Sequence, residues 1–146
     1  LTFNNGVDSP WSNTIIAARK TEFSRSFFVE DGCLKTLVGR VNRSIIKTAG
    51  EEGCLVYGPY VSLPKGEWKA TYVTDEMINN HGDITIDVVS DCGSNIVASK
   101  LIKAVESVQS LEVTFELTEA TDLLEIRIHV TRQTSINILS LTITSN

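Results

Sequence analysis

Hydrophobic and polar residues alternate with a period of two along several segments of the chain. In residues 67–73 an apolar residue occupies every second position, beginning with Trp68, and residues 84–89 and 124–131 repeat this pattern. A period of two is typical of a β-strand with one face in the core and the other in solvent. Further strands are predicted at residues 24–30, 34–41, 54–57, 111–117 and 136–143. About eight to ten short strands separated by turn residues predict an all-β fold, an antiparallel β-sandwich or jelly roll.

The segment 96–109 has two interpretations. Leu101, Val105 and Val108 have helical spacing, whereas Ile96 and Ala98 alternate as they would in a strand. Because the neighbouring segments are predicted strands, we predict that this segment is extended as well.

Composition supports the all-β prediction. Val, Ile and Thr, whose β-branched side chains favour extended backbone, make up 43 of the 146 residues. The length suits one domain, which we divide into an N-terminal segment, 1–23, and a sandwich core, 24–144. The chain starts at Leu1 with neither an initiator methionine nor a signal-peptide pattern, and we therefore expect it to be part of a longer protein.

The charge and hydropathy of the chain argue against two classes of partner. The formal net charge is −5 at pH 7, whereas a nucleic-acid module needs a concentrated basic surface. No apolar run approaches the ~18 residues of a membrane-spanning helix. We expect no nucleic-acid partner and no membrane-spanning segment.

Three cysteines, Cys33, Cys54 and Cys92, have spacings that match no metal-binding or redox motif. An odd number of cysteines favours a reducing compartment, so we expect buried free thiols in a cytoplasmic protein. A Cys33–Cys54 disulfide with a free Cys92 is the alternative.

The sequence contains no recognisable catalytic motif. Its two histidines, His81 and His129, stand in none of the patterns of hydrolases or metalloproteases. Asp87 and Glu125 are a carboxylate pair of the kind that hydrolyses glycosides, but such pairs are frequent on sheet surfaces. We therefore predict a protein that is not an enzyme.

No cofactor and no metal-ligating residue is predicted. Acidic turns leave calcium open as a ligand, because carboxylates in loops are the groups that bind it. The acidic clusters are 30–31, 51–52 and the pair Glu119 and Asp122, and none has a specific ligand spacing.

Polar residues on the non-core side of the predicted strands are the candidate binding residues. If their strands are neighbours in one sheet, they form a polar face whose planar hydrogen-bonding groups suit a sugar. Cross-strand ion pairs on a solvated sheet are the competing interpretation. The candidates are Lys69, Thr71, Asp87, Glu125, Arg127 and His129.

Aromatic side chains are the second component that a sugar site needs, because the C–H face of a sugar stacks on them. Tyr57 and Tyr60 bracket Gly58 and Pro59, and we expect one of them in the core and the other at a sheet edge. Tyr60 is the candidate binding residue, whereas Trp68 shares its register with core positions. Trp11 is predicted to be exposed in the N-terminal segment.

The stretch from Gly53 to Trp68, with Tyr57-Gly58-Pro59-Tyr60 and Leu63-Pro64-Lys65-Gly66 at its centre, is the most specific local motif. It resembles the carbohydrate-binding, jelly-roll-type domains attached to bacterial glycosyltransferases and surface-polysaccharide enzymes. Residues 86–88 and 124–128 resemble later strands of that family, so the resemblance extends over about 25–144. Trp68 stands where the family has Tyr.

The resemblance implies a non-catalytic module that recognises a bacterial surface polysaccharide or its terminal sugar, with Asp87, Glu125 and Arg127 at the family's polar positions. It also implies a catalytic or transport domain in the same polypeptide, in the cytoplasm or at the inner face of the membrane. The alternative is a structural module that assembles with other proteins and has no sugar ligand. If the glycan is acidic, we expect Arg127, Lys69 or Arg40 to supply the charge partner. Replacement of Arg127 by Ala is then expected to weaken binding and leave the melting temperature nearly unchanged, whereas a large loss of stability would indicate a structural ion pair.

Overall fold

The computed structural model describes residues 23–79, 82–103 and 107–146. This part of the chain contains eleven strands and two single-turn 3-10 helices. In chain order they are β1 (Ser24–Phe28), η1 (Val29–Asp31), β2 (Gly39–Asn42), β3 (Ile45–Thr48), β4 (Gly53–Val56), β5 (Pro59–Leu63), β6 (Gly66–Asn79), β7 (Ile84–Ser90), η2 (Asp91–Gly93), β8 (Asn95–Ile102), β9 (Ser107–Leu117), β10 (Thr121–Val130) and β11 (Asn137–Ser145).

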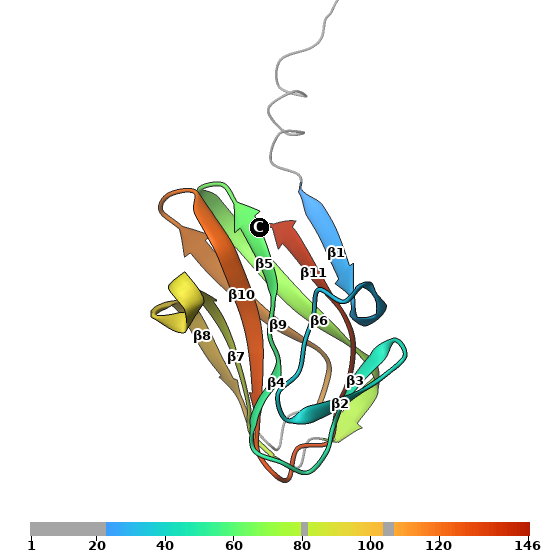
Figure 1. Cartoon of the computed structure of the whole chain (residues 1–146). Coiled ribbons are helices and arrows are strands. Elements are labelled where there is room, and N and C mark those ends of the chain that lie inside the picture. The colour runs from blue at the N-terminus through green and yellow to red at the C-terminus, as the bar shows by residue number, and fades with distance from the viewer. Residues whose placement is uncertain (1–22, 80–81, 104–106) are drawn as a thin grey trace, which may run out of the picture.

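The strands form two antiparallel sheets that pack face to face (Figure 1), which confirms the predicted β-sandwich. One sheet has six strands in the order β2-β3-β11-β6-β9, with β1 paired to β11. The other has five strands in the order β4-β10-β7-β8, with β5 paired to β10. Most pairs join strands that are distant in the sequence, as in jelly-roll folds.

The core lies between the two sheets and follows the predicted alternation. Trp68, Ala70 and Tyr72 of β6 are buried against apolar residues of β7 and β10. The Tyr72 hydroxyl donates a hydrogen bond to the Ile126 carbonyl of β10, so one buried phenol links the two sheets. Burial of this continuous apolar layer is the main stabilising contribution to such a sandwich.

One prediction about local structure was wrong in part. Residues 34–38 are not a strand; Lys35 forms an isolated β-bridge to Tyr57, and β2 starts at Gly39. The strand predicted at 54–57 is present as β4, shifted by one residue, and β5 follows after Gly58. At Gly58 φ is +110° and a side chain would collide with the Cys33 carbonyl oxygen, so this position requires glycine.

The described residues of the 96–109 segment are extended. β8 covers its first part and β9 begins at Ser107, so the strand prediction is confirmed there. Residues 104–106 lie outside the described ranges.

All three thiols are free, which rules out the Cys33–Cys54 disulfide in this structure. The expectation that they are buried was wrong for Cys33, which follows η1, and for Cys92, which lies within η2; both are exposed. Cys54, in β4, is half-buried.

The two helices of the described ranges are single turns, and none there has the length and apolar character needed to cross a bilayer.

Candidate functional site

The structure places the predicted binding residues on two different faces. Asp87 of β7 and Glu125, Arg127 and His129 of β10 lie on neighbouring strands of the five-stranded sheet. Lys69 and Thr71 lie on β6, in the six-stranded sheet, so the expectation of one shared polar face was wrong for them. Alternation predicts which side of a strand points outward, but it does not predict which strands are paired.

Strand register brings the charged residues of the five-stranded sheet together. Arg127 of β10 is directly opposite Asp87 of β7, and the next position on the same face pairs His129 with Thr85. Directly opposite side chains on one face of an antiparallel pair are close neighbours, so opposite charges in this register form a cross-strand ion pair.

Asp87 is the centre of a hydrogen-bonded cluster. Arg127 donates from Nε to Oδ1 and from Nη2 to Oδ2, both at 2.9 Å, in a bidentate arrangement. His129 Nε2 lies 3.2 Å from the same Oδ2. The Asp87 side chain is 8% exposed, against 24% for Arg127 and 33% for His129, so the carboxylate lies beneath its two partners.

This cluster keeps Asp87 ionised. Burial alone would raise the pKa of its carboxyl, but the hydrogen bonds and charges of His129 and Arg127 outweigh burial and hold the pKa below its ordinary value. The pKa of the Arg127 guanidinium is raised, chiefly by its hydrogen bonds to Asp87. The cluster is therefore a preorganised ion pair with a histidine beside it.

Glu125 is a second carboxylate on this face and is only 7% exposed. The Tyr60 phenol interacts with it electrostatically: burial, followed by the Glu125 charge, raises the pKa of Tyr60. Tyr60 itself is 41% exposed and has a φ of +67°, which is rare for a residue with a side chain. Tyr60 lies on β5, which pairs with β10. Its role as a binding residue stays a prediction.

Cys54 extends the same face and was not predicted as part of it. It pairs with His129 across β4 and β10, and its thiol donates to the Val56 carbonyl at 3.3 Å. Burial raises the pKa of this thiol to about 11, so it is a neutral, half-buried group at neutral pH.

The turn η2 lies against the opposite end of the cluster, beside β8 and β10 (Figure 1). Asp91 and Cys92 have φ values of +53° and +54°, and a side chain at Gly93 would come within 3.3 Å of Arg127 Nη1. Unusual backbone conformations of this kind often occur around functional sites. Among these residues only the turn character of 91–95 was foreseeable from sequence.

Exposed apolar side chains border the polar cluster. Ile96 and Leu101 of β8 are 63% and 49% exposed, and Leu123 of β10 is 58% exposed. Leu101 is opposite Thr85, and Ile96 is opposite Val89, so both lie across β7 from the charged residues of β10. The face therefore combines a hydrogen-bonding centre with an apolar margin.

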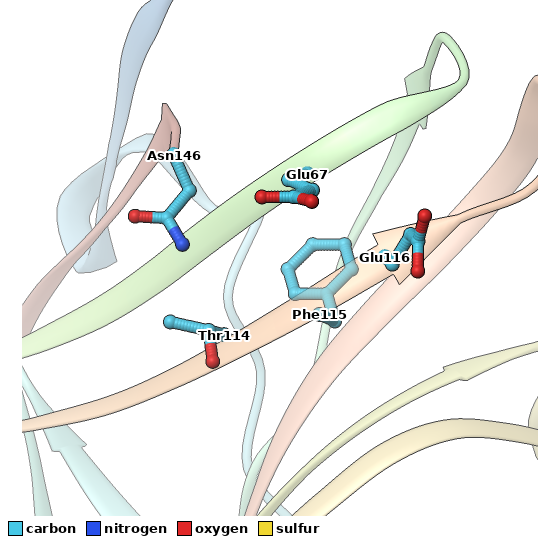
Figure 2. Close-up of a pocket in the computed structure, with 5 residues that line it drawn as sticks. All are labelled: Glu67, Thr114, Phe115, Glu116 and Asn146. Atoms are coloured by element: carbon cyan, nitrogen blue, oxygen red, sulfur yellow. The ribbon is translucent and has the colours of Figure 1, made fainter.

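A shallow pocket of about 230 Å³ lies on the other sheet (Figure 2). It is formed by Glu67 of β6, residues 114–116 of β9 and Asn146 after β11. Glu67 and Glu116 are directly opposite each other in the register and both are exposed. Lys69 and Thr71 belong to the same strand as Glu67, but neither lines this pocket.

In the described ranges no group of three or more His, Cys, Asp or Glu residues is arranged to hold a metal ion, and the acidic turns considered for calcium are no exception. Trp11 and His81 lie outside these ranges.

No protein-family model and no curated protein sequence matches the chain. Among solved structures, the C-terminal CBM6 of LamC, a marine laminarinase from Zobellia galactanivorans, aligns with a TM-score of 0.50 and 10% identity over 84% of this chain and 99% of that one. The Glycosylation Associate Protein (Gap123) complex from Streptococcus agalactiae aligns with a TM-score of 0.53 and 10% identity, over 84% of this chain and 26% of that one. At this identity the likenesses show a shared β-sandwich fold.

Proposed function

We propose that this protein is a non-catalytic carbohydrate-binding module and that it binds its ligand on the outer face of the five-stranded sheet. The observation that carries the proposal is the Asp87–Arg127–His129 cluster, held in one rigid geometry on an exposed sheet face. The CBM6 neighbour, a carbohydrate-binding module of the same fold, supports it.

The chemistry of the face suits a sugar. Sugar hydroxyls both donate and accept hydrogen bonds, and the cluster offers acceptors on Asp87 and Glu125 and donors on Arg127 and His129. The apolar margin on β8 and the exposed Tyr60 ring suit the C–H face of a sugar ring. Because strands hold these groups, little ordering is required on binding.

A comparison of two faces tests the proposal. Purified protein is screened against neutral, amino and acidic glycans by array, and hits are measured by titration calorimetry. Replacement of His129 by Ala should weaken binding about tenfold, because it removes one hydrogen bond to the sugar. It leaves the Asp87–Arg127 ion pair intact. The matched control, Lys69→Ala on the opposite sheet, should bind like the wild type. No hit on the array, or an equal loss in both variants, would contradict the proposal.

A finer hypothesis concerns biological context. The ligand in this hypothesis is a bacterial surface polysaccharide or its terminal sugar, and a glycosyltransferase or exporter domain lies in the same polypeptide in the cytoplasm. Tethering would raise the effective concentration of the glycan beside that domain. Hits confined to surface polysaccharides would support this context, and a preference for plant or storage glycans would contradict it.

An assembly module is the second candidate function. The likeness to one part of the Gap123 complex favours it, as do the exposed Ile96 and Leu101 on the edge strand β8. Lys100 lies on the edge strand β8, opposite the core residue Ile86. An inward-facing charge on an edge strand opposes pairing with a further strand, so a partner protein would contact the outer face of the sheet and not its edge. A molar mass that rises with concentration, and falls back in Ile96→Ser, would favour this function.

A further inference from the structure

We infer that the face around Asp87 selects uncharged or amino-bearing sugars and rejects sugars that carry a carboxylate. This inference rests on the proposed carbohydrate-binding function and names the ligand class for that same site. It comes from how the charges of the face are already paired with one another.

The positive charge of the face is already neutralised. Asp87 occupies the Nε–Nη2 edge of Arg127, one of the edges through which a guanidinium binds a carboxylate in the bidentate manner, and its charge compensates that of Arg127. Nη1 remains next to Gly93 in η2, where it is placed to donate to a single neutral acceptor such as a hydroxyl or an amide oxygen.

The negative charge of the face is not fully neutralised. Asp87 and Glu125 each carry a formal charge of −1 and Arg127 carries +1, so with neutral His129 the face has a net formal charge of −1. Both carboxylates are less than 10% exposed, so their charges are weakly screened by solvent. The neighbouring turn adds Asp91, another acid, rather than a base.

A carboxylated sugar would therefore meet repulsion without a matching cation. Hydroxyls and ammonium groups, in contrast, find acceptors on the same two carboxylates. Like-charge juxtaposition is an effective means of rejecting a wrong ligand, so we expect at least about tenfold weaker binding of a uronate than of its uncharged counterpart.

The experiment uses the whole 146-residue chain on an array that carries neutral oligosaccharides, glucosamine oligomers, oligogalacturonates, and glucuronate- and sialate-terminated glycans. Hits should fall in the neutral and amino classes. A uronate or sialate as the best ligand would overturn the inference but leave the proposed function intact. An array without any hit would overturn the proposed function, and this inference with it.

A charge-removal variant tests the cause. Asp87→Asn leaves the positive charge of Arg127 without its carboxylate partner, and it should raise the affinity for the uronate counterpart of the best hit by about tenfold. Glu112→Gln, which removes one exposed carboxylate from the opposite sheet, is the matched control and should leave the preference unchanged. Circular dichroism verifies the fold, and Glu125→Gln provides the same change of charge if Asp87→Asn does not fold. An unchanged preference in the folded variant would overturn the charge explanation.

Discussion

The outer faces of the two sheets both carry polar groups but arrange them differently. On the five-stranded sheet the polar groups are largely buried and bonded to one another, with Asp87 beneath Arg127 and His129. On the six-stranded sheet they are more exposed and arranged in rows of hydroxyls and carboxylates. One such row is Ser26, Thr142, Thr71 and Glu112.

This difference indicates on which face the polar side chains are constrained by their partners. A carboxylate that is 8% exposed needs its partners, because an unpaired buried charge is costly. Exposed hydroxyls and carboxylates have water as an alternative partner, so their substitution changes the free energy of unfolding little. On the six-stranded sheet Glu67 lies directly opposite Glu116, a pair of like charges. On the described strands of the five-stranded sheet, no two like charges lie directly opposite each other.

The largest expected effect comes from breaking the ion pair. Arg127→Ala should lower the free energy of unfolding by about 2 kcal/mol, because it leaves Asp87 buried with only His129 as a partner. Lys69→Ala on the six-stranded face should change it by less than about 0.5 kcal/mol. Urea denaturation of both variants measures the difference.

The bidentate geometry thus revises the expectation from sequence that Arg127→Ala leaves the melting temperature nearly unchanged. Equal stability losses in the two variants would show that Asp87 recovers its hydration when Arg127 is removed, and the two faces would then be energetically equivalent.

A smaller effect is expected from the hydrogen bond that joins the sheets. Tyr72→Phe removes the donor to the Ile126 carbonyl without removing the ring from the core, so unfolding should become easier by about 1 kcal/mol. The denaturant dependence should keep its slope, because the buried area is almost unchanged. A loss of less than about 0.3 kcal/mol would mean that the carbonyl finds another donor.

Local sequence patterns predicted much of the fold and part of the site. Alternation correctly placed Trp68 and Tyr72 in the core and Arg127 and His129 on an outer face, because side-chain direction in a strand depends only on local geometry. Pairing is a long-range property, and for this reason the sequence did not show that Lys69 and Thr71 lie in a different sheet from Asp87 and Arg127.

The backbone around the cluster was also beyond sequence reasoning. The positive φ values of Tyr60 and Cys92 occur at residue types that do not ordinarily favour them, and the surrounding tertiary structure imposes them. Similarly, Cys54 joins the face only because β4 pairs with β10, two strands separated by more than sixty residues.

Acid should weaken the five-stranded face selectively. The folded-state pKa of Asp87 lies below its unfolded value, so its contribution to stability is complete above the unfolded pKa and is lost as pH falls through the folded pKa. Wild-type protein should therefore lose more stability than Asp87→Asn as the pH falls from about 5 through the folded-state pKa of Asp87, and the two should converge at the acid end. Urea midpoints across this range measure the difference, and a constant gap between the two proteins would contradict the assignment.

The smallest expected effect is a gain on the six-stranded face. Glu116→Lys should place a cation opposite Glu67, replacing repulsion with attraction, and should raise the free energy of unfolding by about 0.5 kcal/mol at low salt. Glu119→Lys, in the turn before β10, makes the same change of net charge without a cross-strand partner. The gain should disappear in about 1 M NaCl, where the screening length is about 3 Å. If both variants were stabilised equally, relief of the overall negative charge would be the cause, and the pairing of Glu67 with Glu116 would carry no energetic weight.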